Sequence, residues 1–386
     1  MGWSPRRLLR LGKATRRRSR RRSGGSGWFG SIWRSVGPTA TGIGIVGLIG
    51  TALFGGIDLS RLDVGRSSAT DEVRDASGKT AIKVGMDASR LPGVPPDQLF
   101  ASDPRSNPTI RVATFNLGNF GEKKSSDPEV MDRIAMVVSR FDVVALQEVH
   151  GEDAEPIRRL VDRLRRGGAP FAATVSDRIG KNERYRESYA FLWNEATVQM
   201  IPGTDFLVAD PGGRMAREPM ACSFRCRLPP DVPQQPFTFT LINVHTAPSA
   251  VTPQADPNEM DALDDVYISV ANYGWDQFQE DDVILLGDLN VDRDHFRQLD
   301  RIESLHSVGG NAPTNTRRSA CYDHIVIDQN ATGEFSGRWG VYDLTTALQV
   351  DIQDALSISD HQPVWAEFEM IEALPSMAAG RTRVIR

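Results

Sequence analysis

Polar side chains that could do chemistry lie where apolar segments of this chain end. Residues 281–292, DDVILLGDLNVD, hold a four-residue apolar run between acids, with Asp288 and Asn290 just after Gly287. A short apolar run closed by glycine predicts a strand covered on both faces in a layered sheet. If the chain stays extended there, Asp288 and Asn290 face the same way. Strand ends of this kind are where ligands usually bind, although a polar turn is the commoner meaning of the fragment alone.

The same arrangement, a polar side chain at or beside the end of an apolar segment, recurs along the chain. The residues that share it are Asn116, Glu148, Glu187, His245, Asp288, Asn290, Asp323, Asp360 and His361. Each one alone has a structural explanation, because asparagine shapes turns, surface carboxylates are solvated and a lone histidine is more often structural than catalytic. Two of the six histidines of the chain belong to the set, together with several carboxylates and two amides. The combination therefore indicates a reaction site.

Phosphodiester hydrolysis is the chemistry that this combination suits. Glu148 and Asp360, helped by Asn116, would provide hard oxygen ligands for Mg²⁺, with Mn²⁺ or Ca²⁺ as alternatives. Such a cation keeps several waters and bridges to the substrate phosphate. Asp288 would orient or deprotonate the attacking water, and Asn290 would hold a phosphate oxygen.

Two histidines complete the expected site. A histidine that donates or accepts a proton near neutral pH needs a carboxylate that fixes its tautomer and orientation. The sequence offers two acids for this purpose, Glu187 for His245 and Asp323 for His361. We therefore expect two histidine–carboxylate pairs.

The charge of the chain is divided unevenly. Residues 1–34 contain eleven Lys or Arg and no acid, which leaves 34 basic against 50 acidic residues in the remainder, a formal charge of −16. An acidic body repels polyanions, so a phosphate substrate would need a metal cation to bridge the two.

An uncharged segment of 22 residues, 36–57, follows the basic block. A bilayer core of roughly 30 Å needs about 20 such residues in a helix, so this length predicts one membrane crossing. The basic flank precedes the segment, so the N-terminus is expected in the cytoplasm and the rest of the chain outside it. A cleaved signal peptide, which would release a secreted protein, and a nucleic-acid-binding arginine arm are the alternatives.

The pattern of elements predicts one large domain with appendages. We expect a basic tail at 1–35, an anchor at 36–57, a linker at 58–108, a catalytic domain at 109–370 and a loose tail at 371–386. Buried strands are expected at 109–116, 142–149, 188–193, 237–245, 281–288, 322–328 and 363–370, and helices at 127–141, 152–168 and from near 258. Strands outnumber helices, which favours an α/β fold of two packed mixed sheets with helices outside. Three cysteines are too few for a disulfide framework.

At these residues the chain resembles the endonuclease/exonuclease/phosphatase superfamily, and within it the deoxyribonuclease I branch. The motifs shared with the superfamily are FNLGNF, LQEV, GDLNVD, YDHI and SDHQPV, which run from 116 to 361. Closer to the nuclease branch are YRESYAFLW, REP, HTAP and DALDDVY. The resemblance implies a four-layered α/β sandwich, divalent metal dependence, the two histidine–carboxylate pairs and a catalytic domain that is monomeric.

The resemblance also implies residues that contact substrate. Tyr185 and Arg217 would touch the DNA backbone, and His150, Thr314 and Thr316 occupy further positions of the family's substrate-binding motifs. His150 and His324 stand where the nuclease branch has arginines, and arginine is the better side chain for a narrow, negative groove. The disulfide of the branch lacks a partner, because Arg293 follows GDLNVD and only Cys321 lies nearby.

The sequence thus favours a membrane-anchored, metal-dependent phosphodiesterase, an endonuclease that acts on DNA outside the cytoplasm. A first alternative keeps the fold and metal but acts on sphingomyelin or an inositol phosphate; an apolar hairpin beside the site would favour it, and the sequence offers none. A second alternative is a phosphate-binding scaffold without activity, which predicts the replacement of Glu148, Asp288 or His361, and all three are present.

Overall fold

The computed structural model describes residues 72–74, 80–82, 108–181 and 186–373. Two short strands in the expected linker, β1 (Glu72–Arg74) and β2 (Thr80–Ile82), pair in antiparallel fashion. The expected anchor at 36–57 lies outside the described residues. Within the described part, no helix combines the length and the apolar character that a membrane crossing requires.

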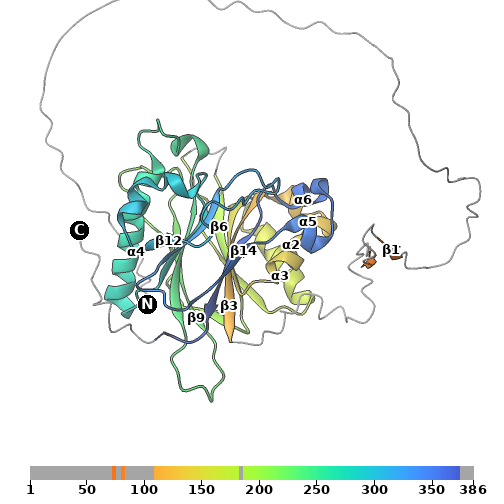
Figure 1. Ribbon diagram of the computed structural model, residues 1–386, viewed down its shortest axis with the longest axis horizontal. Helices are drawn as coiled ribbons and strands as arrows, with labels where there is room; N and C mark the ends of the chain where they lie inside the picture. Colours follow the sequence, from red (N-terminus) through yellow and green to blue (C-terminus); the bar gives the residue numbers. More distant parts are fainter. Residues whose placement is uncertain (1–71, 75–79, 83–107, 182–185, 374–386) are drawn as a thin grey trace, which may run out of the picture. The chain divides into compact units, whose positions relative to one another are not determined.

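Two mixed β-sheets form the body of the domain (Figure 1). The first has six strands in the order β14–β15–β3–β4–β6–β5. Their bounds are β3 (Thr109–Phe120), β4 (Val143–Val149), β5 (Phe171–Val175), β6 (Ser188–Asn194), β14 (Phe335–Val341) and β15 (Val364–Glu369). The second has seven strands, in the order β12–β13–β11–β10–β9–β7 with β8 paired to β9. Their bounds are β7 (Val198–Met200), β8 (Phe206–Leu207), β9 (Met220–Cys226), β10 (Thr238–His245), β11 (Val283–Asp288), β12 (Leu305–Ser307) and β13 (Asp323–Asp328).

Helices cover the outer face of each sheet, as Figure 1 shows. On the six-stranded sheet lie α2 (Pro128–Val138), α3 (Glu155–Arg166), α5 (Leu344–Leu348) and α6 (Ile352–Ile358), with the single turn α1 (Glu122–Ser125) beside them. On the seven-stranded sheet lies α4 (Leu263–Phe278). The order helix, sheet, sheet, helix confirms the expectation of two packed mixed sheets with helices outside.

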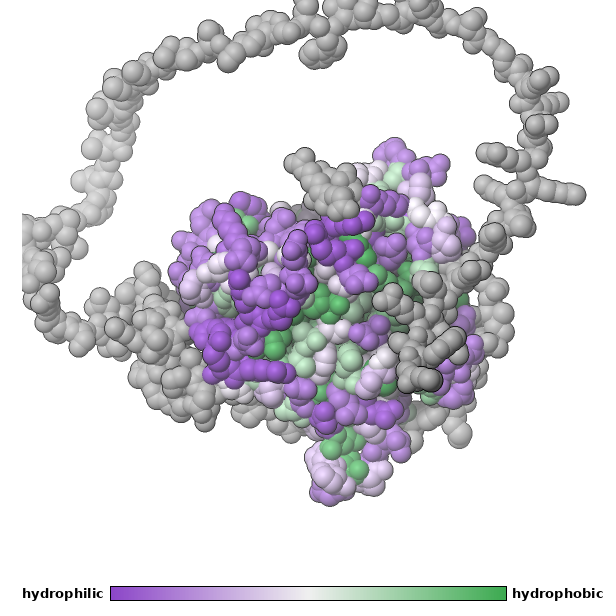
Figure 2. Space-filling model, turned by 180° about the vertical axis from the view of Figure 1, so that it is seen from behind, coloured by the Kyte–Doolittle hydropathy of each residue, from purple (hydrophilic) through white to green (hydrophobic). Residues whose placement is uncertain are grey.

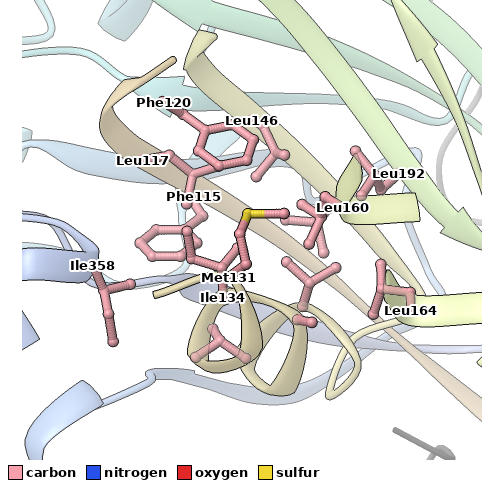
Figure 3. Packing of buried hydrophobic residues seen from close by; sticks show 14 of the residues in the cluster. Phe115, Leu117, Phe120, Met131, Ile134, Leu146, Leu160, Leu164, Leu192 and Ile358 are labelled. Atoms are coloured by element: carbon pink, nitrogen blue, oxygen red, sulfur yellow. The ribbon is translucent and has the colours of Figure 1, made fainter. Parts of the chain in front are cut away.

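Three buried apolar clusters hold these layers together. Figure 3 shows the first, in which Phe115, Leu117 and Phe120 of β3 pack against Met131 and Ile134 of α2, and against Leu160 and Leu164 of α3. A second cluster fills the space between the sheets, and a third lies between the seven-stranded sheet and α4. Burial of apolar surface at about 25 cal/mol per Å² is the main stabilising contribution to such layers.

Local signals explain where the helices begin. Asp127 caps α2 by accepting hydrogen bonds from the N–H groups of Glu129 (3.0 Å) and Val130 (3.2 Å), and Pro128 is its first residue. The helix expected from near 258 begins at Leu263 instead. Asn258 caps a separate 3₁₀ turn, η4 (Glu259–Asp261). The residues predicted to begin the helix therefore form this turn instead.

Strand alternation decides which side chains face the space between the sheets. On β3, Ile110 and Val112 belong to the cluster between the sheets, and Asn116 continues the same alternate row. The rows of four other strands end in the same way. The row through Leu241 and Asn243 ends at His245, and the row through Ile284 and Leu286 ends at Asp288. Toward the start of their strands, the row of Tyr189 ends at Glu187 and that of Ile325 ends at Asp323. The apolar layer between the sheets therefore becomes polar at one end.

Two parallel strand pairs bring these ends together. β3 pairs with β4 and β10 pairs with β11 in parallel, whereas the other pairings of the two sheets are antiparallel. In the second sheet His245 is the register partner of Asp288, which in turn is the partner of Asp323. Three of the sequence-predicted residues thus lie side by side on adjacent strands.

Several elements were not predicted from the sequence. All seven expected strands are present, but β5, β7, β8, β9, β12 and β14 and the short helices α1, α5 and α6 were missed. The domain also continues past residue 370, since Ile371 pairs with Pro236 and the N–H of Glu372 donates to the carbonyl of Gln235. The three cysteines are buried and free.

The surface seen from behind is mostly hydrophilic, with a smaller hydrophobic area within it (Figure 2). In the part of the chain that the structure describes, the large hydrophobic side chains that are exposed are Phe278, Trp339 and Ile352.

Gly287 provides a test of the strand end that carries Asp288. Its φ of +146° is unfavourable for other residues, and a Cβ there would collide with the carbonyl group of Val244 on β10. Gly287→Ala is therefore expected to destabilise the protein by more than about 4 kcal/mol. Gly203→Ala is the matched control, because its φ is +79° and nothing lies within 4 Å of the added carbon, so it should cost only about 1–2 kcal/mol. Urea unfolding followed by circular dichroism measures both, and equal losses would contradict the proposed collision.

Candidate active site

Asp288 lies at the centre of the polar end of the intersheet layer. Its Oδ2 atom accepts a hydrogen bond from Nδ2 of Asn116 at 2.9 Å. The same oxygen lies 3.6 Å from Nε2 of His245 and 3.6 Å from Nε2 of His361. Its Oδ1 atom accepts the N–H of Asn290 at 3.0 Å. Two imidazole rings therefore converge on one carboxylate oxygen.

The environment of Asp288 raises its pKa. The side chain is buried, and burial disfavours the charged carboxylate most. Asp323 adds repulsion, while His361, His245 and the hydrogen bond from Asn116 act in the opposite direction. The carboxylate is thus held in a place where a proton binds more readily than it does in water.

Each histidine is backed by the acid that the sequence assigned to it. Nδ1 of His245 lies 2.7 Å from Oε1 of Glu187, and Nδ1 of His361 lies 2.9 Å from Oδ2 of Asp323. A carboxylate at Nδ1 turns the Nε2 edge of each ring toward Asp288. Both rings are thereby fixed in orientation by a second buried acid.

The two pairs raise the pKa values of both rings. Burial lowers the pKa of His361, but the charges of Asp323 and Asp288 and the hydrogen bond to Asp323 outweigh it and bring the pKa to about 10. Burial likewise opposes protonation of His245, and Glu187 and Asp288 overcome it, so that its pKa is raised. In the absence of a metal, a protonated His361 is the form favoured at neutral pH.

Glu148 reaches the site because its strand bulges. Residues of β4 with even numbers, such as Leu146, face the helices, but Glu148 has a φ of +58° and the pairing with β6 shifts register around it. Its Oε1 accepts from Nδ2 of Asn116 at 3.2 Å, and its Oε2 accepts from the N–H of Asn119 at 2.7 Å. Burial raises its pKa, but His245 and these two donors prevail and lower it, which favours the ionised form.

The third expected metal ligand, Asp360, is exposed and lies next to Gly118 of β3. Among the described residues, no donor bonds its carboxylate, so both oxygens are available to a cation. Glu148, Asp360 and the amide oxygen of Asn116, which accepts the N–H of Gly118 at 2.9 Å, are hard oxygen donors of the kind that Mg²⁺ or Mn²⁺ prefers. The side-chain atoms that cluster most closely here, however, belong to Asp288, Asp323 and His361, which lie within 4.8 Å of one another.

Lys124 was not predicted from the sequence. Its Nζ donates to the carbonyl oxygens of Leu117 (2.6 Å) and Ile358 (2.8 Å), and also to that of Gly118. Burial lowers its pKa to about 8, although Asp360 and Glu148 both favour its charged form. The ammonium group therefore ties the end of β3 to the segment that carries Asp360. A lysine after FNLGNFGE carries no motif that would have revealed this.

Arg217, expected to contact the DNA backbone, packs beside Glu187. Its Nε lies 3.1 Å from Oε2 of Glu187, an ion pair without hydrogen-bond geometry, and its Nη1 donates to the carbonyl of His245 at 3.4 Å. Its side chain is 11% exposed. Tyr189, also missed from the sequence, accepts the N–H of His245 through its hydroxyl at 2.8 Å. Both residues hold the Glu187–His245 pair in place.

Thr314 and Thr316, expected among the substrate-binding residues, are buried. The Thr314 hydroxyl donates to Oδ2 of Asp323 at 2.7 Å and accepts the N–H of Asp323 at 3.0 Å. The Thr316 hydroxyl donates to the carbonyl oxygens of Ser359 (2.8 Å) and His361 (3.2 Å). In this structure the two side chains therefore support the Asp323–His361 pair from behind.

The remaining expected residues differ in their positions. Asn290 has a φ of +52°, so the chain does not stay extended after Asp288, and the condition under which the two side chains were expected to face the same way is not met. Its Nδ2 donates to the carbonyl of Thr246 at 2.9 Å. His150 is partly buried, with Nδ1 3.2 Å from the carbonyl oxygen of Arg186. Tyr185 lies outside the described residues. His324 is a core residue, and burial lowers its pKa to about 4.

A cleft of about 540 Å³ opens beside the site, lined by residues that include Asn290, Asn311, Pro313 and Tyr322. The ring of Tyr322 lies 5.9 Å from that of His361. The cleft is thus adjacent to the site through Asn290 and Tyr322 and has room for a substrate segment.

Comparison with known proteins gives a consistent result. The Endonuclease/Exonuclease/phosphatase family matches residues 113–361. Deoxyribonuclease-1-like 1 of Chlorocebus aethiops is 30% identical over 276 residues, which cover 68% of this chain and 86% of the relative. Deoxyribonuclease-1 of Gallus gallus is 27% identical over 279 residues, or 66% of this chain and 91% of the relative. The structure of the human Nocturnin catalytic domain with bound sulfate anion aligns with 68% of this chain and 94% of that chain, at 15% identity and a TM-score of 0.44.

The histidine–carboxylate pairs predict a distinctive titration. With chelator present, the pKa of His361 should lie near 10, and Asp323→Asn should lower it markedly because the main favourable charge is removed. Since the folded pKa exceeds the ordinary value of 6.5, protonation of His361 stabilises the fold fully below about pH 6.5, and this contribution is lost as the pH rises toward 10. NMR of the histidine ring protons measures the pKa. Asp300→Asn, which removes an exposed acid paired with Arg293, is the control, and an unchanged His361 in Asp323→Asn would contradict the pairing.

Proposed function

The chain belongs to the endonuclease/exonuclease/phosphatase family, and on this premise we propose that it is a divalent-metal-dependent endonuclease that cleaves DNA. The observation that carries the proposal is the convergence of two acid-backed histidines, His245 and His361, on one oxygen of Asp288 at 3.6 Å. Hydrolysis of a phosphodiester needs a group that takes a proton from water and another that supplies one to the leaving oxygen. The three side chains provide both within a few ångströms.

In the proposed reaction a water molecule attacks phosphorus while the bond to the leaving oxygen breaks. Asp288, whose raised pKa suits a proton acceptor, takes the proton from the attacking water. His361, whose pKa is raised by Asp323 and Asp288, supplies a proton to the leaving oxygen, and His245 donates a hydrogen bond to the phosphoryl oxygens, whose negative charge grows in the transition state. Asn290, at the mouth of the cleft, would bind a phosphate oxygen after leaving the Thr246 carbonyl.

Glu148, Asp360 and Asn116 would hold the metal. The bound cation would offset the negative charge of the phosphate and of the acidic domain. Asn116 also contacts Asp288 through Nδ2, so it would couple the position of the metal ligands to that of the proton acceptor. Lys124 is a positioning residue in this scheme, because it joins the backbone of Leu117 on β3 to that of Ile358, two residues before Asp360.

DNA is the proposed substrate because this chain is similar to deoxyribonucleases across most of its catalytic domain. Arg217 and Tyr185 would contact the backbone of the DNA, and His150 would lie where the nuclease branch places an arginine in the minor groove. Thr314 and Thr316 would act through Asp323 and His361. We also propose that residues 36–57 anchor the protein in a membrane with the catalytic domain outside the cytoplasm, which rests on the basic flank and the uncharged length of that segment.

His361→Ala is expected to reduce nicking of duplex DNA by about 10²- to 10⁴-fold, because it removes the group that protonates the leaving oxygen. His306→Ala is the matched control, since His306 is exposed on β12. Plasmid relaxation and circular dichroism measure activity and folding.

The same proteins are tested with single-stranded DNA, RNA, sphingomyelin and inositol phosphates. If a lipid or inositol phosphate is hydrolysed while DNA stays intact, that compound is the substrate of the proposed mechanism. Full activity in folded His361→Ala would refute the role assigned to His361.

Glu148→Gln tests the metal ligands separately. Loss of one ionised oxygen ligand should raise the Mg²⁺ concentration needed for half-maximal activity by about 10- to 100-fold, while excess chelator abolishes activity of the unaltered protein. Glu152→Gln removes an exposed carboxylate a few residues away and should leave the metal requirement unchanged. A metal titration of initial rates distinguishes the two. Identical curves for both variants would exclude Glu148 as a ligand.

A further inference from the structure

A second cluster of acids lies at the other end of β11 from Asp288. Glu280 and Asp282 directly precede β11, Glu334 precedes β14, and Glu372 follows β15. Asp282 and Asp288 are six positions apart along an extended strand, which corresponds to roughly 20 Å. The cluster is therefore distinct from the catalytic site and plays no part in the proposed hydrolysis.

The carboxylates lie close enough to share one ion. Glu280, Asp282 and Glu372 each place an oxygen within 4.8 Å of the others. The charge of Glu334 is the strongest single repulsion that raises the pKa of Asp282, so we count Glu334 as a fourth member. Among the described residues, no lysine, arginine or histidine forms an ion pair with any of these four acids.

Two oxygens of the cluster lack a partner despite deep burial. Asp282 is 1% exposed and Glu334 is 2% exposed, yet Oδ1 of Asp282 and Oε2 of Glu334 have no hydrogen-bond donor among the described residues. The hydroxyl of Thr332, beside Asp282, also makes no hydrogen bond of good geometry. Buried polar groups in folded proteins are almost always bonded, and a buried charge without a partner is costly. These oxygens need either protons, which Asp282 would share with Glu280 and Glu334, or a bound cation.

The other oxygens of the cluster are fixed by backbone donors. Oε1 of Glu280 accepts the N–H of Asp282 at 2.9 Å, Oε1 of Glu334 accepts the N–H of Ala373 at 2.6 Å, and Oε2 of Glu372 accepts the N–H of Thr238 at 3.3 Å. Each of these three carboxylates is therefore held in place by at least one backbone N–H group. A set of acids whose positions are already fixed is suited to binding an ion with little reorganisation.

The electrostatic state of the cluster supports the same conclusion. Burial, followed by mutual repulsion, raises the pKa of Glu372 to about 7, and burial also raises that of Glu280 to about 7. Burial and the neighbouring acids raise the pKa of Asp282 and of Glu334 as well. Near neutral pH the cluster must gain protons or a cation to relieve this repulsion.

We propose that Glu280, Asp282, Glu334 and Glu372 form a structural binding site for Ca²⁺. Ca²⁺ accepts six to eight oxygen ligands in irregular geometry, whereas Mg²⁺ requires a near-ideal octahedron and keeps its waters. Four carboxylates and the Thr332 hydroxyl from three separate segments match the first preference. The ion would join the start of β11 in one sheet to the start of β14 and the end of β15 in the other.

The test is a comparison of Ca²⁺ binding and thermal stability in the full chain at pH 8. Saturating Ca²⁺ should raise Tm on the order of 5 °C in the unaltered protein after removal of metals, because the ion binds only the folded state. Asp282→Asn and Glu372→Gln should lose this rise, and equilibrium dialysis should show one Ca²⁺ fewer per chain than in the unaltered protein. Glu372 is partly exposed, so its variant remains informative if Asp282→Asn does not fold.

Two controls separate this site from the catalytic one. Glu148→Gln should keep the Ca²⁺-dependent rise in Tm while changing the metal requirement for hydrolysis, and Glu369→Gln, an exposed acid of β15, should keep both. Absence of a Tm response in the unaltered protein, or an equal response in Asp282→Asn and Glu372→Gln, would overturn the proposal. A Tm that rises on acidification from pH 8 to 6 without any Ca²⁺ response would show that the acids share protons only, and would overturn it too.

Discussion

Burial of the Asp288 carboxylate is the constraint on which the rest of the site depends. A charge removed from water is tolerated only when it is paired and hydrogen-bonded. Asn116, His245 and His361 supply those contacts, and each then needs support of its own. Glu187 and Asp323 hold the rings, while Arg217, Tyr189 and Thr314 hold these two acids and the backbone beside them. Asp288 is thus held by a first layer of residues that contact it, and a second layer of residues holds the first.

The same contacts hold the two sheets in one relative position. Asn116 belongs to the six-stranded sheet and Asp288 to the seven-stranded sheet, so their hydrogen bond crosses the intersheet layer. One step deeper, Nε2 of Gln147 on β4 donates to Oδ1 of Asn243 on β10 at 2.7 Å. Apolar packing alone would allow the sheets to slide, because it has no preferred direction, whereas hydrogen bonds fix the offset. The geometry of the site thus depends on polar residues placed within an otherwise apolar layer.

Much of this arrangement could be predicted from the sequence because it depends on local alternation. Short segments of sequence predict the strand that ends at Asp288 and the cap at Asp127. The number of suitable acids predicts that each histidine is paired with one. The left-handed turn at Asn290 and the bulge at Glu148 could not be predicted. Their backbone conformations depend on how neighbouring strands pair, which the local sequence does not specify. Lys124 was missed for a related reason, since its three acceptors come from segments that are brought together only by the fold.

The first strand of the domain is paired with the last. β3 occupies the centre of its sheet with β15 on one side and β4 on the other, and His361 lies just before β15. At about 5–20 residues per second, a ribosome needs on the order of tens of seconds to make the chain between them. During that time one edge of β3 is unpaired, and neither Asp360 nor His361 has been synthesised. A fragment that ends before residue 360 therefore lacks both a proposed metal ligand, Asp360, and the proposed proton donor, His361.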